Sequence, residues 1–216
     1  MAKIDFSCSA LLIIDVQNDF CPGGPLEVRN GLKIIEPLNS IAAIFTERSG
    51  MVIATQDWHP VNHASFAASH KDKKPYDTID IGEVHNQVLW PIHCVQGSTG
   101  ADFHKDLNSK SINLIIRKGF RRGLDAYSAF FENDRKTPTG LDGLLKSLSI
   151  NTVVIGGLAT DYCVLYSALD ATTLGYKAVV VENAVYGIDF PAGSVETSLS
   201  LMDKSGVIFV SSGDIQ

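Results

Sequence analysis

The sequence lacks closely spaced cysteines. Its four cysteines are scattered along the chain and form no CxxC pair: Cys8, Cys21, Cys94 and Cys163. A framework of disulfide bonds is not expected for cysteines that are so few and so far apart in a chain of this size. We therefore expect reduced thiols and a cytoplasmic location, with a nuclear location left open.

The chain also lacks an excess of positive charge and any long hydrophobic run. Its formal net charge is −6 at pH 7, which gives no support for binding nucleic acid or an anionic membrane. No apolar stretch reaches the length of a membrane span, and the N-terminal residues do not resemble a signal peptide. We expect neither a nucleic-acid partner nor a membrane partner.

What is present is the composition of an ordinary globular protein. Hydrophobic residues make up 45% of the 216 residues and charged residues 19%. A chain of this length can bury a substantial core, and it contains no internal repeat, linker or low-complexity segment. We predict one domain that spans residues 1–216.

Short apolar runs alternate with helical patterns along the chain. Six runs are typical of buried strands: 9–14, 51–56, 113–118, 152–156, 177–183 and 207–212. Helical spacing is found at 29–47, 141–148, 160–175 and 194–206, with Pro37 expected to break or kink the first helix. The pattern favours an α/β fold in which a parallel sheet is covered by helices on both faces. The long polar stretch 58–110 indicates a functional loop region.

Chemically capable residues follow four of these strands. Asp15 and Asp57 come directly after the first two, Lys118 ends the third, and a Gly-Gly turn before Cys163 ends the fourth. The carboxyl ends of parallel strands lie at one edge of the sheet, where ligands bind in such folds. We therefore expect a site at this edge.

Thr160 or Asp161 is expected to cap a helix that runs to Gly175, and Cys163 is expected in the first turn of this helix. Free backbone N–H groups and the helix dipole at such a place favour a thiolate and can hold an oxyanion. A nucleophile is one interpretation of this residue. A buried, unreactive cysteine that packs the helix against the sheet is the other.

Asp15 and Lys118 supply what a nucleophilic thiol needs. A free thiol has a pKa of about 8.5, so it requires a base or a positive field to react at neutral pH. Lys118 would supply the field, and Asp15 would take the proton and later return it to a leaving amine. Taken singly, each of the two could be an ordinary residue at the end of a strand.

Asp57, His59, His63 and His93 form a second constellation, which we treat as separate from the first. An Asp-x-His pair at the end of a strand points both side chains the same way. Carboxylate and imidazole groups suit Zn²⁺, Fe²⁺ or Mn²⁺. The alternative is that these histidines only form hydrogen bonds with their neighbours.

Six segments, in order along the chain, resemble the nicotinamidase/pyrazinamidase branch of the isochorismatase-like cysteine hydrolases. They are ALLIIDVQNDFCPGGPLEV (10–28), TQDWHPVNHASF (55–66), WPIHCVQGSTGADF (90–103), KGF (118–120), AYSAF (126–130) and GGLATDYCV (156–164). The resemblance implies a three-layer αβα fold whose Rossmann-like sheet has six mainly parallel strands.

The resemblance also implies roles for single residues. The family's catalytic triad falls on Asp15, Lys118 and Cys163. Its metal ligands fall on Asp57, His59 and His93, with His63 matching a fourth ligand of some members. Its oxyanion hole falls on the backbone N–H groups of Ala159 and Cys163, with a cis peptide bond at Leu158–Ala159. Its aromatic ring pocket falls on Phe20, Trp90 and Tyr127.

The implied reaction is hydrolysis of nicotinamide to nicotinate and ammonia through a cysteine thioester, in NAD salvage. Pyrazinamide is an expected further substrate. The implied cofactor is one divalent metal ion, with zinc as the first choice and iron or manganese as alternatives. The implied partner is the small-molecule substrate, and a homo-oligomer is left open.

Three other interpretations stay open at this point. The first is an amidase or hydrolase of the same superfamily that acts on another small amide or on isochorismate. The second is a binding protein that keeps the fold without catalysis. The third is a metal-dependent hydrolase in which a metal-bound water attacks and Cys163 is only structural.

Overall fold

A six-stranded sheet forms the centre of the protein. The computed structural model describes residues 4–216. The strand order is β5-β2-β1-β6-β7-β8, and every neighbouring pair runs parallel, which confirms the predicted sheet. The strands span Ser9–Ile14 (β1), Met51–Asp57 (β2), Leu114–Lys118 (β5), Thr152–Leu158 (β6), Lys177–Tyr186 (β7) and Ile208–Val210 (β8).

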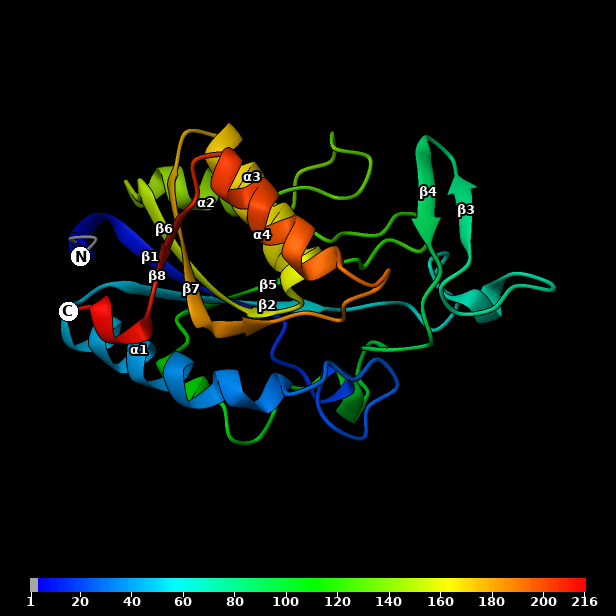
Figure 1. The fold of residues 1–216 in the computed structure, drawn as a ribbon, viewed down its shortest axis with the longest axis horizontal. Coiled ribbons are helices and arrows are strands. Elements are labelled where there is room, and N and C mark those ends of the chain that lie inside the picture. The colour runs from blue at the N-terminus through cyan, green and yellow to red at the C-terminus, as the bar shows by residue number, and fades with distance from the viewer. Residues whose placement is uncertain (1–3) are drawn as a thin grey trace.

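Helices cover both faces of this sheet, as Figure 1 shows. One face carries α1 (Ile35–Glu47), and the other carries α2 (Leu141–Ser147), α3 (Leu165–Thr173) and α4 (Ser194–Lys204). Side chains of β1 alternate between the two layers: Leu11 and Ile13 pack in the apolar cluster that includes α1, whereas Leu12 and Ile14 pack in the cluster that includes α3. All of β1 is buried because both faces are covered. The three-layer αβα prediction is confirmed.

The first helix differs from its prediction. Helical spacing over 29–47 suggested one helix broken or kinked at Pro37. The structure instead has a 3-10 turn at Gly31–Ile34, and α1 begins at Ile35. Pro37 lies in the first turn of α1, where its missing N–H is not needed, so the helix continues to Glu47.

The polar stretch 58–110 contains more structure than the sequence indicated. An antiparallel hairpin of β3 (Thr78–Ile81) and β4 (Val84–Val88) stands apart from the main sheet in Figure 1. The segment begins beyond the carboxyl end of β2 and returns along the sheet to β5. It therefore brings its side chains over the edge where the predicted residues lie.

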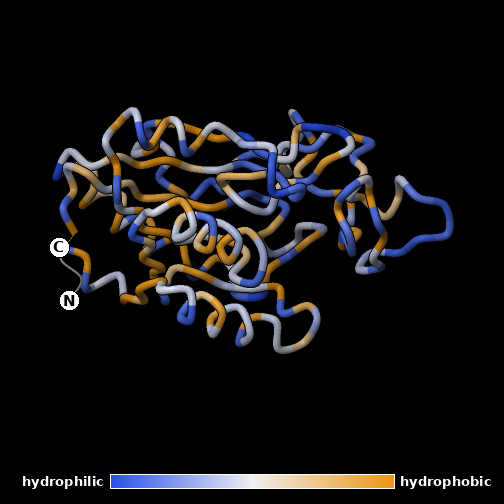
Figure 2. Tube along the Cα trace, turned by 90° about the horizontal axis from the view of Figure 1, so that it is seen from above, coloured by the Kyte–Doolittle hydropathy of each residue, from blue (hydrophilic) through white to orange (hydrophobic). Residues whose placement is uncertain are grey.

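Hydropathy follows this arrangement. In Figure 2 the strands of the sheet are mainly hydrophobic, and the loop farthest from the sheet is hydrophilic. Among residues 4–216, no helix combines the length and the apolar composition required to cross a membrane.

Candidate active site

The carboxyl ends of β1, β2, β5 and β6 bring the predicted residues to one edge of the sheet. Asp15 follows β1, Asp57 ends β2 and Lys118 ends β5. The register pairs Asp57 with Lys118 across β2 and β5. Cys163 lies in the turn that follows β6. Parallel strand order thus assembles residues that are up to 148 positions apart in the chain.

The Lys118 ammonium lies at the centre of the group. Its Nζ is 2.9 Å from Asp15 Oδ2, 3.3 Å from Cys163 Sγ and 2.5 Å from Asp57 Oδ1, and it also donates a hydrogen bond of 2.9 Å to Ala126 O. All of these side chains are buried. One ammonium therefore contacts a carboxylate base, a thiol and a second carboxylate at once.

Burial and charge set the protonation of this group. Burial disfavours the charged form of Lys118, but Asp15 and Asp57 outweigh it and raise the pKa of Lys118 well above its usual value. Burial also raises the pKa of Asp15, with the charge of Lys118 offsetting only part of the shift. A carboxylate with a raised pKa is a stronger base than an exposed one.

The Cys163 thiol differs from its prediction. We expected the field of Lys118 and the helix N-terminus to favour a thiolate. Burial instead raises the pKa of Cys163 well above its usual value, and the contact with Lys118 only reduces that effect. The thiol thus keeps its proton until a base removes it, which makes the neighbouring Asp15 more important.

The turn that carries Cys163 has an unusual backbone. Its peptide bond Leu158–Ala159 is cis, and Thr160–Val164 forms a π-helical turn rather than the first turn of an α-helix. Gly157 precedes it with φ at +133°, packed so closely on Ile14 that a Cβ atom would collide with the Ile14 backbone. The predicted cap at Thr160 or Asp161 is wrong, because the cap residue is Ala159 and the turn has no side-chain cap.

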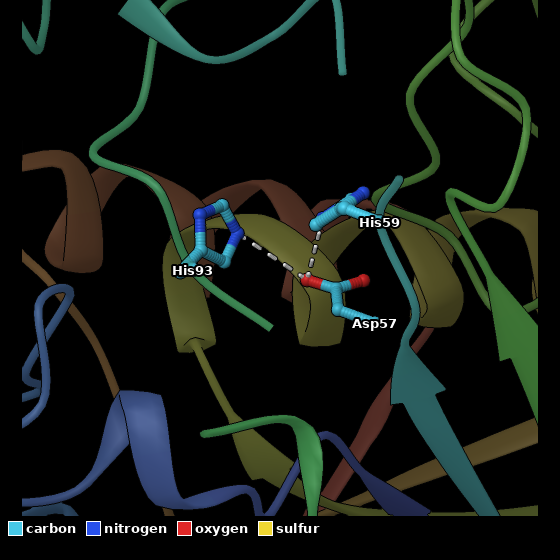
Figure 3. A group of neighbouring side chains, drawn as sticks. All are labelled: Asp57, His59 and His93. Atoms are coloured by element: carbon cyan, nitrogen blue, oxygen red, sulfur yellow. Dashed lines mark ion pairs between the residues drawn. The ribbon is translucent and has the colours of Figure 1, made fainter. Parts of the chain in front are cut away.

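Asp57, His59 and His93 converge on one point (Figure 3). Asp57 Oδ2 lies 3.6 Å from His59 Nε2 and 3.8 Å from His93 Nε2. The other ring nitrogens contact backbone carbonyl groups, His59 Nδ1 at 2.9 Å from Gly119 O and His93 Nδ1 at 2.8 Å from Pro91 O. A carbonyl oxygen only accepts, so each Nδ1 carries a hydrogen, and each Nε2 faces the Asp57 side chain.

This arrangement fits a divalent metal ion. Ligands of such an ion lie within about 4 Å of one another, since each is about 2 Å from the metal. Histidine ligands fixed through the second ring nitrogen are the usual support of a metal site. Burial opposes ionisation of Asp57, but Lys118 and the two imidazole contacts hold its pKa well below the usual range. A carboxylate oxygen and two imidazole nitrogens are a donor set for zinc, iron or manganese.

His63 lies next to this set without completing it. Its ring centroid is 4.5 Å from that of His59. Its Nδ1 lies 2.8 Å from Ser65 Oγ and its Nε2 lies 3.3 Å from Leu124 O, so both nitrogens have partners in the protein. Its ligand atoms group with those of His59 and Asp125 rather than with Asp57 and His93. Its role as a fourth ligand stays a prediction.

A pocket lies between these two groups. It is lined by Cys163 and Ala159, by Asp57 and His93, and by the three predicted aromatic residues, Phe20, Trp90 and Tyr127. Trp90 and Tyr127 meet edge to face, with ring centroids 6.3 Å apart. The pocket is therefore narrow and aromatic, and Cys163, Asp57 and His93 all belong to its lining.

Several residues of this site have no role in the sequence analysis. Leu26, Asp125, Tyr162 and Ile188 also line the pocket. Gln17 lies just outside it, where its side-chain amide accepts from Asp57 N at 2.8 Å and donates to Asp57 O at 2.9 Å. Tyr162 could have been found as the neighbour of Cys163, whereas Ile188 lies in a distant segment that only the fold brings close.

Comparisons with known proteins agree with this geometry. The isochorismatase domain model matches residues 9–214. Nicotinamidase of Acinetobacter baylyi is 47% identical over 206 residues, which cover 95% of this chain and 94% of that protein. The solved structure of the Acinetobacter baumannii nicotinamidase/pyrazinamidase has a TM-score of 0.92 at 48% identity, covering 97% of this chain and 99% of that one.

A further solved structure bears on the metal. Pyrazinamidase of Pyrococcus horikoshii in complex with zinc has a TM-score of 0.77 at 34% identity, with coverage of 94% of this chain and 99% of that one. Family model, sequence identity and fold therefore agree over nearly the whole chain. This chain belongs to the isochorismatase family.

Proposed function

We propose that the protein is a nicotinamidase, an amidohydrolase that converts nicotinamide to nicotinate and ammonia. The observation that carries the proposal is the contact of one buried ammonium, Lys118, with both Asp15 and Cys163 beside an aromatic pocket. The names of the relatives at high identity support the same substrate. The nicotinate that is formed enters NAD salvage.

Acylation begins with proton transfer from Cys163 to Asp15. The sulfur forms a bond to the carboxamide carbon, and the carbonyl electron pair moves to the oxygen. We assign the N–H groups of Ala159 and Cys163 as donors to this oxyanion, a contribution of about 3–4 kcal/mol for each donor. Protonated Asp15 gives its proton to the amide nitrogen while the C–N bond breaks, so ammonia leaves and a thioester remains.

Deacylation again uses Asp15 and Cys163, and the proton now passes from Asp15 back to the sulfur. Asp15 takes a proton from a water molecule whose oxygen forms a bond to the thioester carbon. The C–S bond then breaks, the sulfur recovers the proton from Asp15, and nicotinate leaves. Lys118 stays protonated throughout, because its two carboxylate neighbours raise its pKa, and it holds Asp15 and the sulfur at bonding distance.

The aromatic side chains and the metal ligands orient the substrate. We assign the walls of the pyridine ring to Phe20, Trp90 and Tyr127, and the metal site to Asp57, His59 and His93. These ligands would hold a divalent ion, zinc in our proposal, and the chemistry that it would supply is that of a Lewis acid toward a ring nitrogen or a water. The zinc complex of the Pyrococcus horikoshii relative supports the choice of metal.

Pyrazinamide is a second candidate substrate. Its ring has the size of the pyridine ring and carries the same carboxamide, so the pocket walls and the triad would treat it alike. The two relatives named as pyrazinamidases support this extension.

Ammonia release from nicotinamide by the purified protein tests the proposal, before and after treatment with iodoacetamide. We expect alkylation to destroy activity and nicotinamide to protect against it. The Cys8→Ala variant serves as the control, because Cys8 is the cysteine with partial exposure and lies outside the pocket. Activity that survives alkylation of Cys163 would favour attack by a metal-bound water. Absence of ammonia from folded, metal-loaded protein would reject the nicotinamidase.

A further inference from the structure

The segment that follows β7 forms one wall of the pocket. Residues 187–193, here called the outer loop, connect β7 to α4. Ile188 of this loop lines the pocket together with Cys163. The mechanism above assigns no role to the loop or to the groups that hold it.

Asp161 binds this loop from within the turn of the nucleophile. Its Oδ1 accepts from Ile188 N at 2.9 Å, and its Oδ2 accepts from Asp189 N at 2.9 Å and from Ser194 Oγ at 2.6 Å. Asp161 is 5% exposed and lies two positions before Cys163. We expected Asp161 to cap its own helix, but the carboxylate instead contacts a segment 27 to 33 residues away.

Tyr162, the next residue in the chain, binds the same loop at a second point. Tyr162 Oη donates a hydrogen bond of 2.6 Å to Phe190 O. The Phe190 ring in turn packs on Tyr76 of the polar stretch, with ring centroids 4.4 Å apart. The turn that carries the nucleophile thus holds the outer loop on one side, and the stretch 58–110 meets it on the other.

Two features make Asp161 the residue that contributes most to holding the outer loop. Hydrogen bonds to an ionised carboxylate are roughly twice as strong as bonds between neutral groups. The carboxylate also lies at the N-terminus of α4, where Ser194 is the first helical residue, and the helix dipole favours a negative charge there. Gly187 packs directly against Asp161 and Val195, which leaves the loop no room for a side chain at that position.

We propose that Asp161 is a positioning residue that holds the outer loop, and with it Ile188, in the wall of the pocket that also contains Cys163. The role of this wall in binding nicotinamide rests on the proposed function. The role of Asp161 in holding the loop does not. Because Asp161 and Cys163 belong to one turn, the carboxylate sets the position of the pocket wall relative to the attacking sulfur. A planar aromatic amide is then held with its carbonyl carbon in reach of the thiol.

The Asp161→Asn variant tests the proposal with little change in volume. Its amide has one accepting oxygen and one NH2 group in place of two accepting oxygens. One of the two N–H groups, Ile188 N or Asp189 N, therefore loses its acceptor, and the other loses the negative charge of its acceptor. We expect faster hydrogen exchange at these two amides and faster alkylation of Cys163 by iodoacetamide, about tenfold in each case for the loss of a charge-assisted bond. With nicotinamide we expect KM to rise about tenfold while kcat changes less than about threefold.

Ser194→Ala is the matched control. It removes the hydroxyl that donates to Asp161 but leaves both backbone bonds to the loop, so exchange at Ile188 and Asp189 and the KM are expected to stay near the wild-type values. Tyr162→Phe removes the bond to Phe190 O and keeps the ring, and we expect a smaller rise in exchange, centred on residues after 190. If Asp161→Asn destabilises the whole protein, exchange will rise in the core strands too. Tyr162→Phe then tests whether the turn of the nucleophile holds the outer loop, and unchanged exchange in the loop of this variant would overturn that idea.

The outcomes separate the two proposals. Unchanged hydrogen exchange at Ile188 and Asp189 in folded Asp161→Asn would overturn the proposal that Asp161 holds the outer loop. Faster exchange with an unchanged KM and an unchanged alkylation rate would overturn the link from the loop to the pocket. Exchange and alkylation need no substrate, so they remain informative if the wild-type protein proves inactive on nicotinamide, a result that would reject only the proposed function.

Discussion

Lys118 Nζ lies 2.5 Å from Asp57 Oδ1, and this contact joins the proposed catalytic group to the proposed metal ligands. The other oxygen of Asp57 faces His59 and His93. The sequence suggested two separate constellations, because Asp57 and Lys118 are far apart in the chain. The structure corrects this: β2 and β5 pair in register, so Asp57 belongs to both groups. A substitution in one group can therefore affect the other group through Asp57.

The Cys163→Ala variant tests how far the two groups depend on each other. We expect turnover to fall by about 10⁴-fold or more, as for loss of a nucleophile in other enzymes. Bound metal, measured by elemental analysis, is expected to remain at the wild-type ratio, because Asp57, His59 and His93 are unchanged. Cys163 Sγ also lies within 4.8 Å of oxygens of Asp15 and Asp57. Loss of the metal in this variant would thus indicate that the ion binds near Cys163 Sγ, Asp15 and Asp57 rather than near His59 and His93.

Lys118→Met tests the shared carboxylate. Removing one partner from a buried ion pair costs about 3–5 kcal/mol of folding free energy, because the charges left behind have no compensation. Here two carboxylates, Asp15 and Asp57, would remain without their cation. We expect activity to be lost and chemical denaturation of the metal-free variant to show this destabilisation. Added zinc is expected to recover part of it, because a second cation is then available to Asp57.

Equal destabilisation of Lys118→Met with and without zinc would contradict the shared role of Asp57. The wild-type protein, denatured under the same two conditions, gives the reference for the stabilisation that zinc supplies by binding alone.

Much of this site follows from sequence because strand ends in a parallel sheet share one edge. That rule alone brings Asp15, Asp57, Lys118 and Cys163 together. It cannot say how the side chains pair once they are there, so the Lys118–Asp57 contact was missed. The raised pKa of the Cys163 thiol was also missed, because it depends on neighbours from several elements.

Segments without a regular hydrophobic period were predicted less well. The hairpin of β3 and β4 is short and mostly half-exposed, so its apolar pattern is weak. Pro37 was expected to interrupt a helix, because sequence alone did not show that the helix begins only at Ile35. Asp161 matched a local helix cap, but its true partners, Ile188 and Asp189, are set by the tertiary fold.

In the proposed mechanism, the pH dependence of turnover reports on Asp15. This residue must be ionised to accept the thiol proton, so activity is lost as pH falls through its pKa. Burial raises that pKa above the ordinary 3.8, so the acid limb of kcat/KM is expected above pH 3.8. Thr55 Oγ1 donates a hydrogen bond of 2.6 Å to Asp15 Oδ1, which favours the ionised form.

Thr55→Val removes this donor without a large change in shape. The pKa of Asp15 is then expected to rise further, which moves the acid limb to higher pH by about one unit, the equivalent of one hydrogen bond. The rate on the plateau is expected to change much less than the rate on the limb. An acid limb that stays in place in Thr55→Val would mean that Asp15 is not the group that titrates there.

Gln17 tests whether hydrogen bonds to the backbone of Asp57 support the proposed metal site. Its amide accepts from Asp57 N and donates to Asp57 O, and it also donates to Ala101 O at 2.8 Å. It thus fixes the peptide groups of Asp57 at the point where β1 and β2 end. Gln17→Leu keeps the volume but leaves these buried peptide groups without partners. Loss of such support costs about 10–100-fold in metal affinity at other sites, and we expect the same range here.

Gln56→Leu is the matched control for this prediction. Gln56 is buried and donates to the same Ala101 O at 3.1 Å, but it has no hydrogen bond to Asp57. Competition with a zinc chelator measures the affinity of each variant without reference to turnover. We expect a large loss for Gln17→Leu and a small one for Gln56→Leu. Equal losses would show that general weakening of this buried region, rather than the hold on Asp57, controls metal binding.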